Sequence, residues 1–180
     1  MIRSVDFAAV ARSIQAFLAA RDAPVALIGA LALQCHGVSR ATADLDLLTV
    51  QSVREELVAF LEGSGYETLH VSTGYSNHLA SGEESRRVDV VYVDPATARQ
   101  LFDGAVVREA LPGLEIAVPR AEHLVAMKVR AIKNDPTRRF QDLADVQALM
   151  RGADLDRAEV RGYFDREGLE SLYDEIEASL

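Results

Sequence analysis

The sequence predicts an α/β (α+β) fold, in which a mixed β-sheet is flanked by helices and followed by a C-terminal helical tail. Short apolar runs alternate with helical patterns up to about residue 119, and the chain from Ala121 onward has helical periodicity throughout. The length of 180 residues and the 49% hydrophobic content are sufficient for one packed core. We therefore expect a single domain over residues 1–180, with an α/β core over 1–119 and a helical extension over 120–180.

The N-terminal third predicts a helix, a strand and a short second helix. Asp6 is placed to cap a helix that runs to about Ala20, where apolar residues recur at helical spacing. After Pro24, the short apolar run Val25–Ile28 predicts a buried strand. The small residues of 30–34 then predict a short helix, which ends at a His-Gly pair.

The middle of the chain contains three further strand signals. Residues 44–50 alternate between polar and apolar side chains, the period of a half-buried strand. Ser52 and Glu55 have the spacing of a capping box, so we expect Ser52 to begin the next helix. Residues 66–71 and 87–93 predict two more strands, and the polar stretch 72–85 between them predicts a strand–loop–strand.

The last part of the core and the tail have clear start and stop signals. Pro95 is expected to open a short helix, and residues 114–118 predict the last strand. In the helical tail, Asp135 followed by Pro136 predicts a break, because Asp caps a helix and Pro fits its first position. The sequence contains no internal repeat.

The charge and cysteine content limit the partners and the compartment. The net charge is −9, of which −6 falls on residues 154–180, with nine acidic residues and three arginines. Such a chain is a poor non-specific binder of nucleic acid. No apolar run reaches the length of a membrane span, and the N-terminus has no signal-peptide pattern. With Cys35 as the single cysteine, we expect a cytoplasmic protein without disulfides or a membrane partner.

Asp44 and Asp46 form the strongest local signal for chemistry. On a strand they face the same way, roughly 6.6 Å apart along the chain, whereas Leu45 and Leu47 face the core. Two carboxylates this close repel each other unless a cation lies between them. Magnesium prefers oxygen ligands of this kind together with substrate phosphates. The pair therefore predicts a metal site, although an Asp-x-Asp at a strand edge is also common on solvated surfaces.

Asp89 strengthens the metal hypothesis, because it interrupts an otherwise apolar strand. A carboxylate in such a setting requires a partner or a metal. If its strand lies beside that of Asp44 and Asp46, three carboxylates converge. Such a group suits two Mg²⁺ ions roughly 3.5–4 Å apart, as used for in-line phosphoryl displacement.

An ordered series of motifs over residues 26–48 resembles a known superfamily. An apolar strand and a small-residue turn precede a short helix that ends in His36-Gly37, and an Arg-x-Thr and the Asp-x-Asp follow. This series resembles the nucleotidyltransferases with a polymerase-beta-like core, and in particular the minimal nucleotidyltransferases of the bacterial abortive-infection toxin type. A leucine-rich helix with Lys128 and an Arg-x-x-Asp-x-x-Asp helix over residues 139–145 extend the resemblance to residues 25–150.

The resemblance implies catalytic and metal-binding roles for four residues. Asp44 and Asp46 would hold the metal ions and the nucleotide phosphates. Asp89 would complete the second metal site and help to deprotonate the attacking hydroxyl. Lys128 would approach the phosphates from the helical part of the chain.

It also implies a nucleotide-binding turn. Gly29 and Ala30 would cradle the triphosphate with their backbone N–H groups, and Arg40 would contact a phosphate. The family turn usually reads Gly-Gly or Gly-Ser. Because Ala30 has no hydroxyl and resists positive φ, we expect it to weaken donor binding or slow the reaction.

Several of these residues also have plainer interpretations. Arg40 fits an ion pair with a nearby carboxylate as well as a phosphate contact. A lysine on an apolar helical face, such as Lys128, commonly extends its ammonium to solvent. Arg139 and Asp142 have the i, i+3 spacing of an ordinary salt bridge, and Asp145 fits a structural role.

The functional expectation is the transfer of a nucleoside monophosphate from an NTP to a hydroxyl group. The acceptor is an RNA 3′ end, a protein or a small molecule, and the family resemblance implies a toxin–antitoxin pair with a cognate antitoxin or partner protein. The alternative is a catalytically weakened nucleotide-binding or regulatory protein on the same fold. An RNA-binding module without chemistry is disfavoured by the 6% aromatic content and the acidic tail.

Overall fold

The computed structural model of the chain describes residues 7–80, 87–152 and 154–180. The chain divides into two compact units. The first comprises Met1–Ala32 and Ala41–Pro119, and the second comprises Leu33–Arg40 and Arg120–Leu180. Each unit has its own set of elements and is described separately below.

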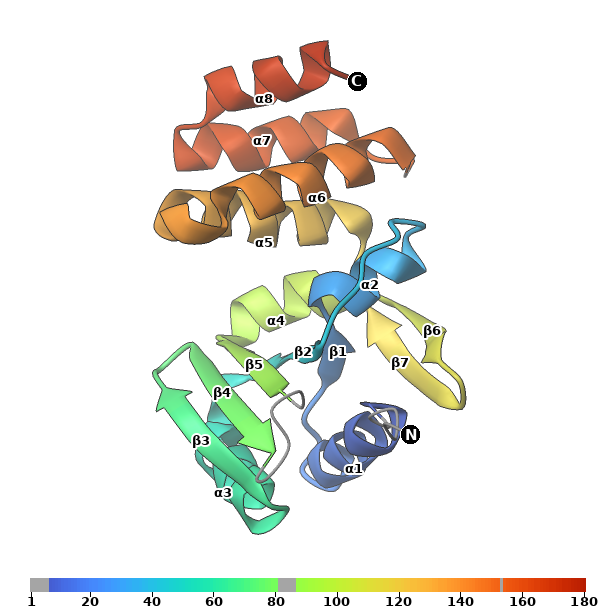
Figure 1. Ribbon diagram of the computed structural model, residues 1–180, viewed down its shortest axis with the longest axis vertical. Helices are drawn as coiled ribbons and strands as arrows, with labels where there is room; N and C mark the ends of the chain where they lie inside the picture. The colour runs from blue at the N-terminus through green and yellow to red at the C-terminus, as the bar shows by residue number, and fades with distance from the viewer. Residues whose placement is uncertain (1–6, 81–86, 153) are drawn as a thin grey trace. The chain divides into compact units, whose positions relative to one another are not determined.

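The first unit is built on a seven-stranded mixed sheet with the strand order β3-β4-β5-β2-β1-β7-β6 (Figure 1). Neighbouring strands run antiparallel except for β2 with β5 and β1 with β7, which are parallel. The mixed sheet confirms the predicted fold class. The strands are β1 (Val25–Leu27), β2 (Asp44–Val50), β3 (Tyr66–Val71), β4 (Tyr75–Ala80), β5 (Arg87–Val93), β6 (Val106–Leu111) and β7 (Leu114–Val118).

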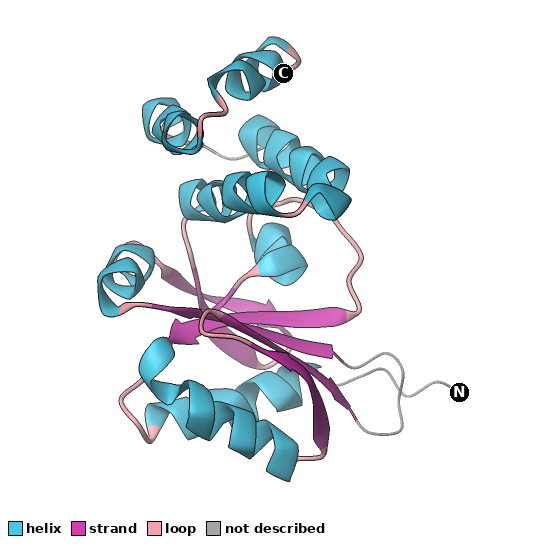
Figure 2. Ribbon diagram, turned by 90° about the vertical axis from the view of Figure 1, so that its left-hand side faces the viewer, coloured by secondary structure: helices cyan, strands magenta, loops and turns pink. Residues whose placement is uncertain are grey.

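Helices pack against both faces of this sheet. Helices α1 (Phe7–Ala19) and α3 (Arg54–Gly63) lie on one face, and α4 (Pro95–Phe102) lies on the other (Figures 1 and 2). Alternate residues of β5 are buried in the core, and in β2 the buried residues are Leu45, Leu47, Leu48 and Thr49. Helix α4 begins as predicted, with Pro95 in its first turn and the Asp94 carboxylate accepting from two backbone N–H groups.

One prediction for this unit is wrong, and one strand was missed. Ser52 does not cap α3, because a 3₁₀ turn over Gln51–Val53 comes first and Val53 occupies the N-cap without a side-chain hydrogen bond. The strand β6 was not predicted. It is the outermost strand at one edge of the sheet, where four of its six residues are exposed, so it lacks the alternation that reveals a half-buried strand.

The polar stretch 72–85 contains the strand β4, which pairs with both β3 and β5. The end of this stretch, where a second strand was expected, includes residues 81–86, which lie outside the described part of the chain. A register shift between Thr68 and His70 places Thr68 opposite His78 and His70 opposite Asn77. The shift is a β-bulge, and it turns Thr68 and His70 toward opposite faces of the sheet.

The second unit is helical, as predicted for the tail. Its elements are the end of α2 (Gly29–Cys35) and the helices α5 (Ala121–Asn134), α6 (Arg139–Gly152), α7 (Arg157–Glu167) and α8 (Glu170–Ala178). The predicted break is present, because Asp135 caps the 3₁₀ turn Pro136–Arg138 through its carboxylate. Among the described residues, no helix has the length and apolar character needed to cross a membrane.

A chain of hydrogen bonds, buried from Tyr92 to His78 and exposed at Glu62, lies on the α3 face of the sheet. The Thr68 hydroxyl donates to Glu62 Oε1 of α3 at 2.7 Å, because a carboxylate only accepts. Thr68 Oγ1 must therefore accept from His78 Nδ1 at 3.1 Å, and the neutral imidazole accepts at Nε2 from the Ser76 hydroxyl at 2.8 Å. Tyr92 then donates to Ser76 Oγ at 2.8 Å. Every donor in the chain points toward Glu62.

The buried, neutral histidine in this chain of hydrogen bonds predicts that the protein loses stability in mild acid. Burial holds the pKa of His78 below its usual value, and burial also lowers the pKa of His123. An unfolded histidine titrates near about 6.5, so below that pH the unfolded chain binds protons that the folded chain does not. The free energy of unfolding should therefore be at its full value above about pH 6.5 and fall as the pH decreases toward the folded pKa values.

Urea unfolding at pH 7.5 and at pH 5.5 measures this loss. His78→Gln should show a smaller decrease between the two pH values than the wild type. The variant His70→Gln, at an exposed position on the neighbouring strand, serves as the control and should show the wild-type decrease. An equal decrease in the wild type and His78→Gln would contradict the interpretation.

Candidate active site

Asp44 and Asp46 lie on β2, on the same face of the sheet. Their neighbours Leu45 and Leu47 are fully buried, whereas both aspartates are only partly buried. The alternation of the strand therefore fixes the direction of both carboxylates, since burying the leucines turns the aspartates toward the other face. That face is opposite to α3, because the Thr68–Glu62 bond places α3 on the side of His78.

Asp89 lies on β5, directly beside Asp46. The strands β2 and β5 are parallel, and their register pairs Asp46 with Asp89 and Asp44 with Arg87. Neighbouring strands lie about 4.8 Å apart, so the side chains of Asp46 and Asp89 are close neighbours on one face. The three aspartates singled out by the sequence thus lie together.

Polar side chains from β4 and β5 contact the Asp89 carboxylate. The Asn77 amide donates from Nδ2 to Asp89 Oδ1 at 2.6 Å, and Arg87 Nε lies 3.6 Å from the same oxygen. Asn77 lies on β4, is 7% exposed and pairs with Asp89 in the register. Sequence analysis missed Asn77, because the polar segment 72–85 does not show which of its residues face the core. The signal was the alternation of Tyr75, Asn77 and Leu79, which places these residues on one face.

Tyr75 is the second residue that sequence analysis missed. It lies two positions before Asn77 on β4, and the Asn77 Nδ2 group donates to its hydroxyl oxygen. Burial raises the pKa of the Tyr75 phenol, and the negative charge of Asp89 raises it further, with a smaller contribution from Asp46. These causes show that the hydroxyl lies in the field of the aspartates.

A row of polar residues crosses four strands at this level of the sheet. His70 pairs with Asn77, Asn77 with Asp89, and Asp89 with Asp46. The β-bulge in β3 brings His70 to this face, where its ring lies 6.0 Å from the ring of Tyr75. The carboxylates are therefore continuous with a polar strip that reaches the edge strand β3.

Gly29 lies against the Asp46 carboxylate at the start of α2. A Cβ atom at position 29 would lie 2.0 Å from Asp46 Oδ2, and the φ angle of +63° is in the left-handed region. The backbone N–H of Ile28 also donates to the Asp46 carbonyl at 2.9 Å. Glycine is required at this position both by the close approach and by the backbone conformation.

Ala30 does not have the strain that we expected of it. Among the described residues, Asp22 is the one non-glycine with positive φ, so Ala30 has an ordinary backbone conformation. Its methyl group is buried in the core. The expectation that Ala30 resists the turn is therefore wrong, since the left-handed residue of the turn is Gly29.

The three aspartates have the right chemistry for magnesium, which prefers hard oxygen ligands. They share one face, and two of them are in register on neighbouring strands. Within residues 7–80, 87–152 and 154–180, no three His, Cys, Asp or Glu side chains are already closed around a metal position. Binding an ion would therefore require the aspartate side chains to turn toward a common point.

In the second unit, Lys128 is the centre of a charged cluster. Its ammonium lies 2.7 Å from Asp142 Oδ1 and 2.8 Å from Asp145 Oδ2, and Arg40 Nη1 lies 3.1 Å from the same Asp145 oxygen. Asp142 is 1% exposed. In the part of the chain that the structure describes, its Oδ2 atom has no hydrogen-bond partner.

This cluster agrees with the ion-pair interpretation of Arg40 and with the structural interpretation of Asp145. The predicted salt bridge between Arg139 and Asp142 is wrong. Asp142 faces Lys128 instead, and Arg139 is exposed. Two cations and two carboxylates make the cluster neutral, so it fastens α5, α6 and the segment that ends at Arg40 within this unit.

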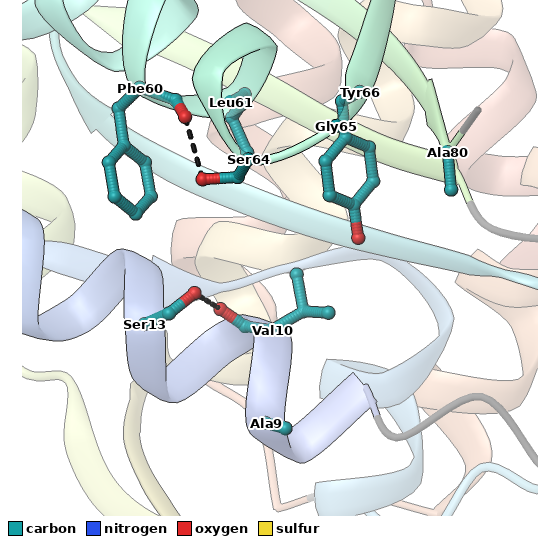
Figure 3. A pocket seen from close by; sticks show the side chains of 9 residues that line it. All are labelled: Ala9, Val10, Ser13, Phe60, Leu61, Ser64, Gly65, Tyr66 and Ala80. Carbon is teal, nitrogen blue, oxygen red and sulfur yellow. Dashed lines mark hydrogen bonds between the residues drawn. The ribbon is translucent and has the colours of Figure 1, made fainter.

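A pocket of about 520 Å³ lies in the first unit between α1, α3 and the adjoining ends of β3 and β4 (Figure 3). Its two serine hydroxyls are bonded to the backbone, Ser13 to Val10 O and Ser64 to Phe60 O. The pocket adjoins α3, whereas the carboxylates lie on the opposite face of the sheet. It is lined by Ala9, Val10, Ser13, Phe60, Leu61, Ser64, Gly65, Tyr66 and Ala80.

Comparison with known families identifies the chain. The profile of the family described as "Nucleotidyl transferase AbiEii toxin, Type IV TA system" matches residues 14–179. The chain belongs to this family. Its family and fold are those of a nucleotidyltransferase, and the AbiEii family is described as the toxin of a type IV toxin–antitoxin system. A search of functionally curated proteins finds no match.

Solved structures share the fold of this AbiEii-family protein. The antibiotic-resistance factor ANT(2'')-Ia in solution has 17% identity and a TM-score of 0.64, with 96% of this chain and 95% of that chain covered. ANT(2'')-Ia in complex with adenylyl-2''-tobramycin has 16% identity and a TM-score of 0.65, with 92% and 98% covered. The lincosamide antibiotic adenylyltransferase LnuA with bound lincomycin has 13% identity and a TM-score of 0.52, with 78% and 94% covered.

A similar fold occurs in an antigenic nucleotidyltransferase-like protein from Paracoccidioides brasiliensis. It has 13% identity and a TM-score of 0.55, with 97% of this chain and 94% of that chain covered. At these identities the likeness concerns the fold alone. It agrees with the mixed sheet described above.

The contact between Gly29 and Asp46 predicts that Gly29→Ala displaces the Asp46 carboxylate. The added methyl group would meet Asp46 Oδ2 and would also be held at an unfavourable φ. We expect this variant to be destabilised by about 1–3 kcal/mol and to lose Mg²⁺-dependent nucleotide binding. Urea unfolding and a thermal-shift titration with MgNTP measure the two effects. Gly63→Ala is the control, since nothing lies within 4 Å of a Cβ atom there and its φ is ordinary.

The Lys128 cluster predicts a large loss of stability in Lys128→Met. The change leaves two buried carboxylates with one cation between them, and removing one partner of a buried ion pair costs about 3–5 kcal/mol. Urea unfolding measures this loss. The double variant Lys128→Met/Asp142→Leu should recover part of it, because the uncompensated charge is removed. Wild-type stability of Lys128→Met would show that the cluster does not hold the unit together.

Proposed function

We propose that the protein transfers a nucleoside monophosphate from an NTP to a hydroxyl group, with magnesium held by Asp44, Asp46 and Asp89. The principal support is the register of β2 and β5, which places Asp46 beside Asp89 with Asp44 on the same face. Membership of the AbiEii family supports the same reaction class. A protein that only binds a partner has little need for three carboxylates on one sheet face, whereas metal-assisted phosphoryl transfer uses such groups as metal ligands.

In the proposed reaction the acceptor oxygen forms a bond to the α-phosphorus, and the bond from that phosphorus to the bridging oxygen breaks. Pyrophosphate leaves with that oxygen, and the hydroxyl proton passes to the Asp89 carboxylate. Bound Mg²⁺, as two ions, would supply charge neutralisation on the phosphates. The protein's own contribution is positional: β2 and β5 fix three acceptor groups at one place.

We assign the triphosphate to the turn formed by Gly29 and Ala30, beside Asp46. The absence of a side chain at Gly29 and the ordinary backbone at Ala30 support this assignment. The same finding removes one of the two grounds for the alternative of a catalytically weakened binding protein, the expected strain at Ala30, and leaves the other, its missing hydroxyl. Roles for Arg40 and Lys128 in phosphate binding are proposed from the family resemblance.

The proposed acceptor is a hydroxyl group of an RNA 3′ end, a protein or a small molecule. ANT(2'')-Ia in complex with adenylyl-2''-tobramycin illustrates the last class on the same fold. The type IV toxin–antitoxin description of the family supports an antitoxin as the cognate partner.

Thermal unfolding with each of the four NTPs, with and without Mg²⁺, tests the proposed site. A ligand at 100 times its Kd stabilises the folded state by about 2.7 kcal/mol, which corresponds to a rise in Tm of roughly 5–10 °C for a chain of this size. We expect at least one NTP to raise the Tm only when Mg²⁺ is present. The rise should disappear in Asp44→Asn, Asp46→Asn and Asp89→Asn.

Asp103→Asn is the matched control, because it makes the same change at an exposed position at the end of α4. It should retain the full Mg²⁺-dependent rise in Tm. An NTP-dependent rise that persists without Mg²⁺, or that survives in Asp46→Asn, would overturn the assignment. An NTP that passes the test is then used in labelled form to screen acceptors.

A further inference from the structure

The hydrogen bonds of the Asn77 amide indicate the roles of Asn77 and Tyr75 on β4. The Nδ2 group has two hydrogens and no accepting lone pair. It lies 2.6 Å from Asp89 Oδ1, and a carboxylate oxygen requires a donor, so Nδ2 rather than Oδ1 must face Asp89. The second contact of Nδ2 is with the Tyr75 hydroxyl oxygen. One hydrogen of the amide therefore serves Asp89, and the other serves Tyr75.

The Tyr75 oxygen must act as an acceptor in this contact. Its own hydrogen is consequently directed away from the Asn77 amide. The hydroxyl lies close enough to Asp89 and Asp46 for both charges to affect it. A phenolic hydrogen that the Asn77 amide does not engage thus lies at the edge of the carboxylate site.

The surroundings of Asn77 hold its amide in place. Its strand β4 lies between β3 and β5, and its side chain is almost completely buried. Because β4 is paired on both edges and the Asn77 side chain is buried, the amide has little freedom to leave Asp89.

We propose that Asn77 is a positioning residue that orients the Asp89 carboxylate for the metal, and that Tyr75 donates its hydroxyl hydrogen to a phosphate oxygen of the bound nucleotide. The inference rests on the proposed function. Phosphate oxygens carry negative charge and accept hydrogen bonds strongly, so they are the natural acceptor for a partly buried phenol beside a metal site. The sequence analysis assigned no role to Asn77 or Tyr75.

The role of Asn77 is tested with Mn²⁺ alone, counted by electron paramagnetic resonance, which reports metal binding without turnover. Loss of an outer-shell partner typically weakens metal binding ten- to a hundredfold. We expect a loss of this size in Asn77→Leu and in the smaller Asn77→Ser, which is included in case the leucine variant does not fold. Ser76→Ala is the matched control: it removes a buried hydrogen bond from the neighbouring position on the opposite face and should bind Mn²⁺ as the wild type does.

The role of Tyr75 is tested with a non-hydrolysable α,β-methylene analogue of the NTP that stabilises the wild type most. Calorimetric titration at saturating Mn²⁺ should show that Tyr75→Phe binds the analogue about tenfold more weakly, while its affinity for Mn²⁺ alone is unchanged. Tyr92→Phe is the matched control, since it loses a tyrosine hydroxyl from the adjacent strand β5 on the other face. It should bind both probes normally.

The outcomes separate this inference from the proposed function. If the wild type binds Mn²⁺ and Asp46→Asn does not, the proposed metal site stands. Wild-type Mn²⁺ affinity in a folded Asn77 variant then overturns the positioning role, and wild-type analogue affinity in Tyr75→Phe overturns the donor role. If the wild type binds no Mn²⁺ with or without the analogue, the proposed function and this inference fall together.

Discussion

The parallel pairing of β2 with β5 is the constraint on which the site depends. It aligns Asp46 with Asp89, and the two-residue period of the strands buries Leu45, Leu47, Val88 and Val90 on the other face. The apolar core and the candidate site thus lie on opposite faces of the same pair of strands. A slip of one residue in either strand would turn its carboxylates into the apolar core, where unpaired charges are very costly. Burial of the leucines and valines therefore maintains the alignment of the aspartates.

Elements around this pair complete the site by contact with the aspartates. Gly29 leaves room for the Asp46 carboxylate because it has no side chain, and Asn77 supplies a donor to Asp89 from β4. The two contacts come from opposite sides of the β2–β5 pair, since β4 adjoins β5 and β1 leads into Gly29 from beside β2. Each aspartate of the central pair thus has a defined neighbour that limits its orientation.

In the helical unit, buried charges are compensated by ion pairs. Arg40, Lys128, Asp142 and Asp145 neutralise one another at distances of 2.7–3.1 Å, within a unit whose other buried groups are mostly apolar. Such a cluster is costly to desolvate, and its intact form is far more favourable than any form that lacks one member. The motif shared with the family in this region therefore has a structural role in this chain, beside the phosphate contact proposed for Lys128.

The sequence by itself determined the mixed α/β class and the helical tail, and it indicated the three aspartates that we propose as metal ligands. These features are local: strand alternation, helix periodicity and a carboxylate in an apolar run can be read from neighbours in the chain. Tertiary structure decided which strands adjoin, and through them the roles of Asn77 and Tyr75 and the pairing of Lys128 with Asp142. Asn77 and Lys128 meet carboxylates that are 12 and 14 residues away in the sequence. Strand pairing and charge compensation, rather than local propensity, determine where these contacts form.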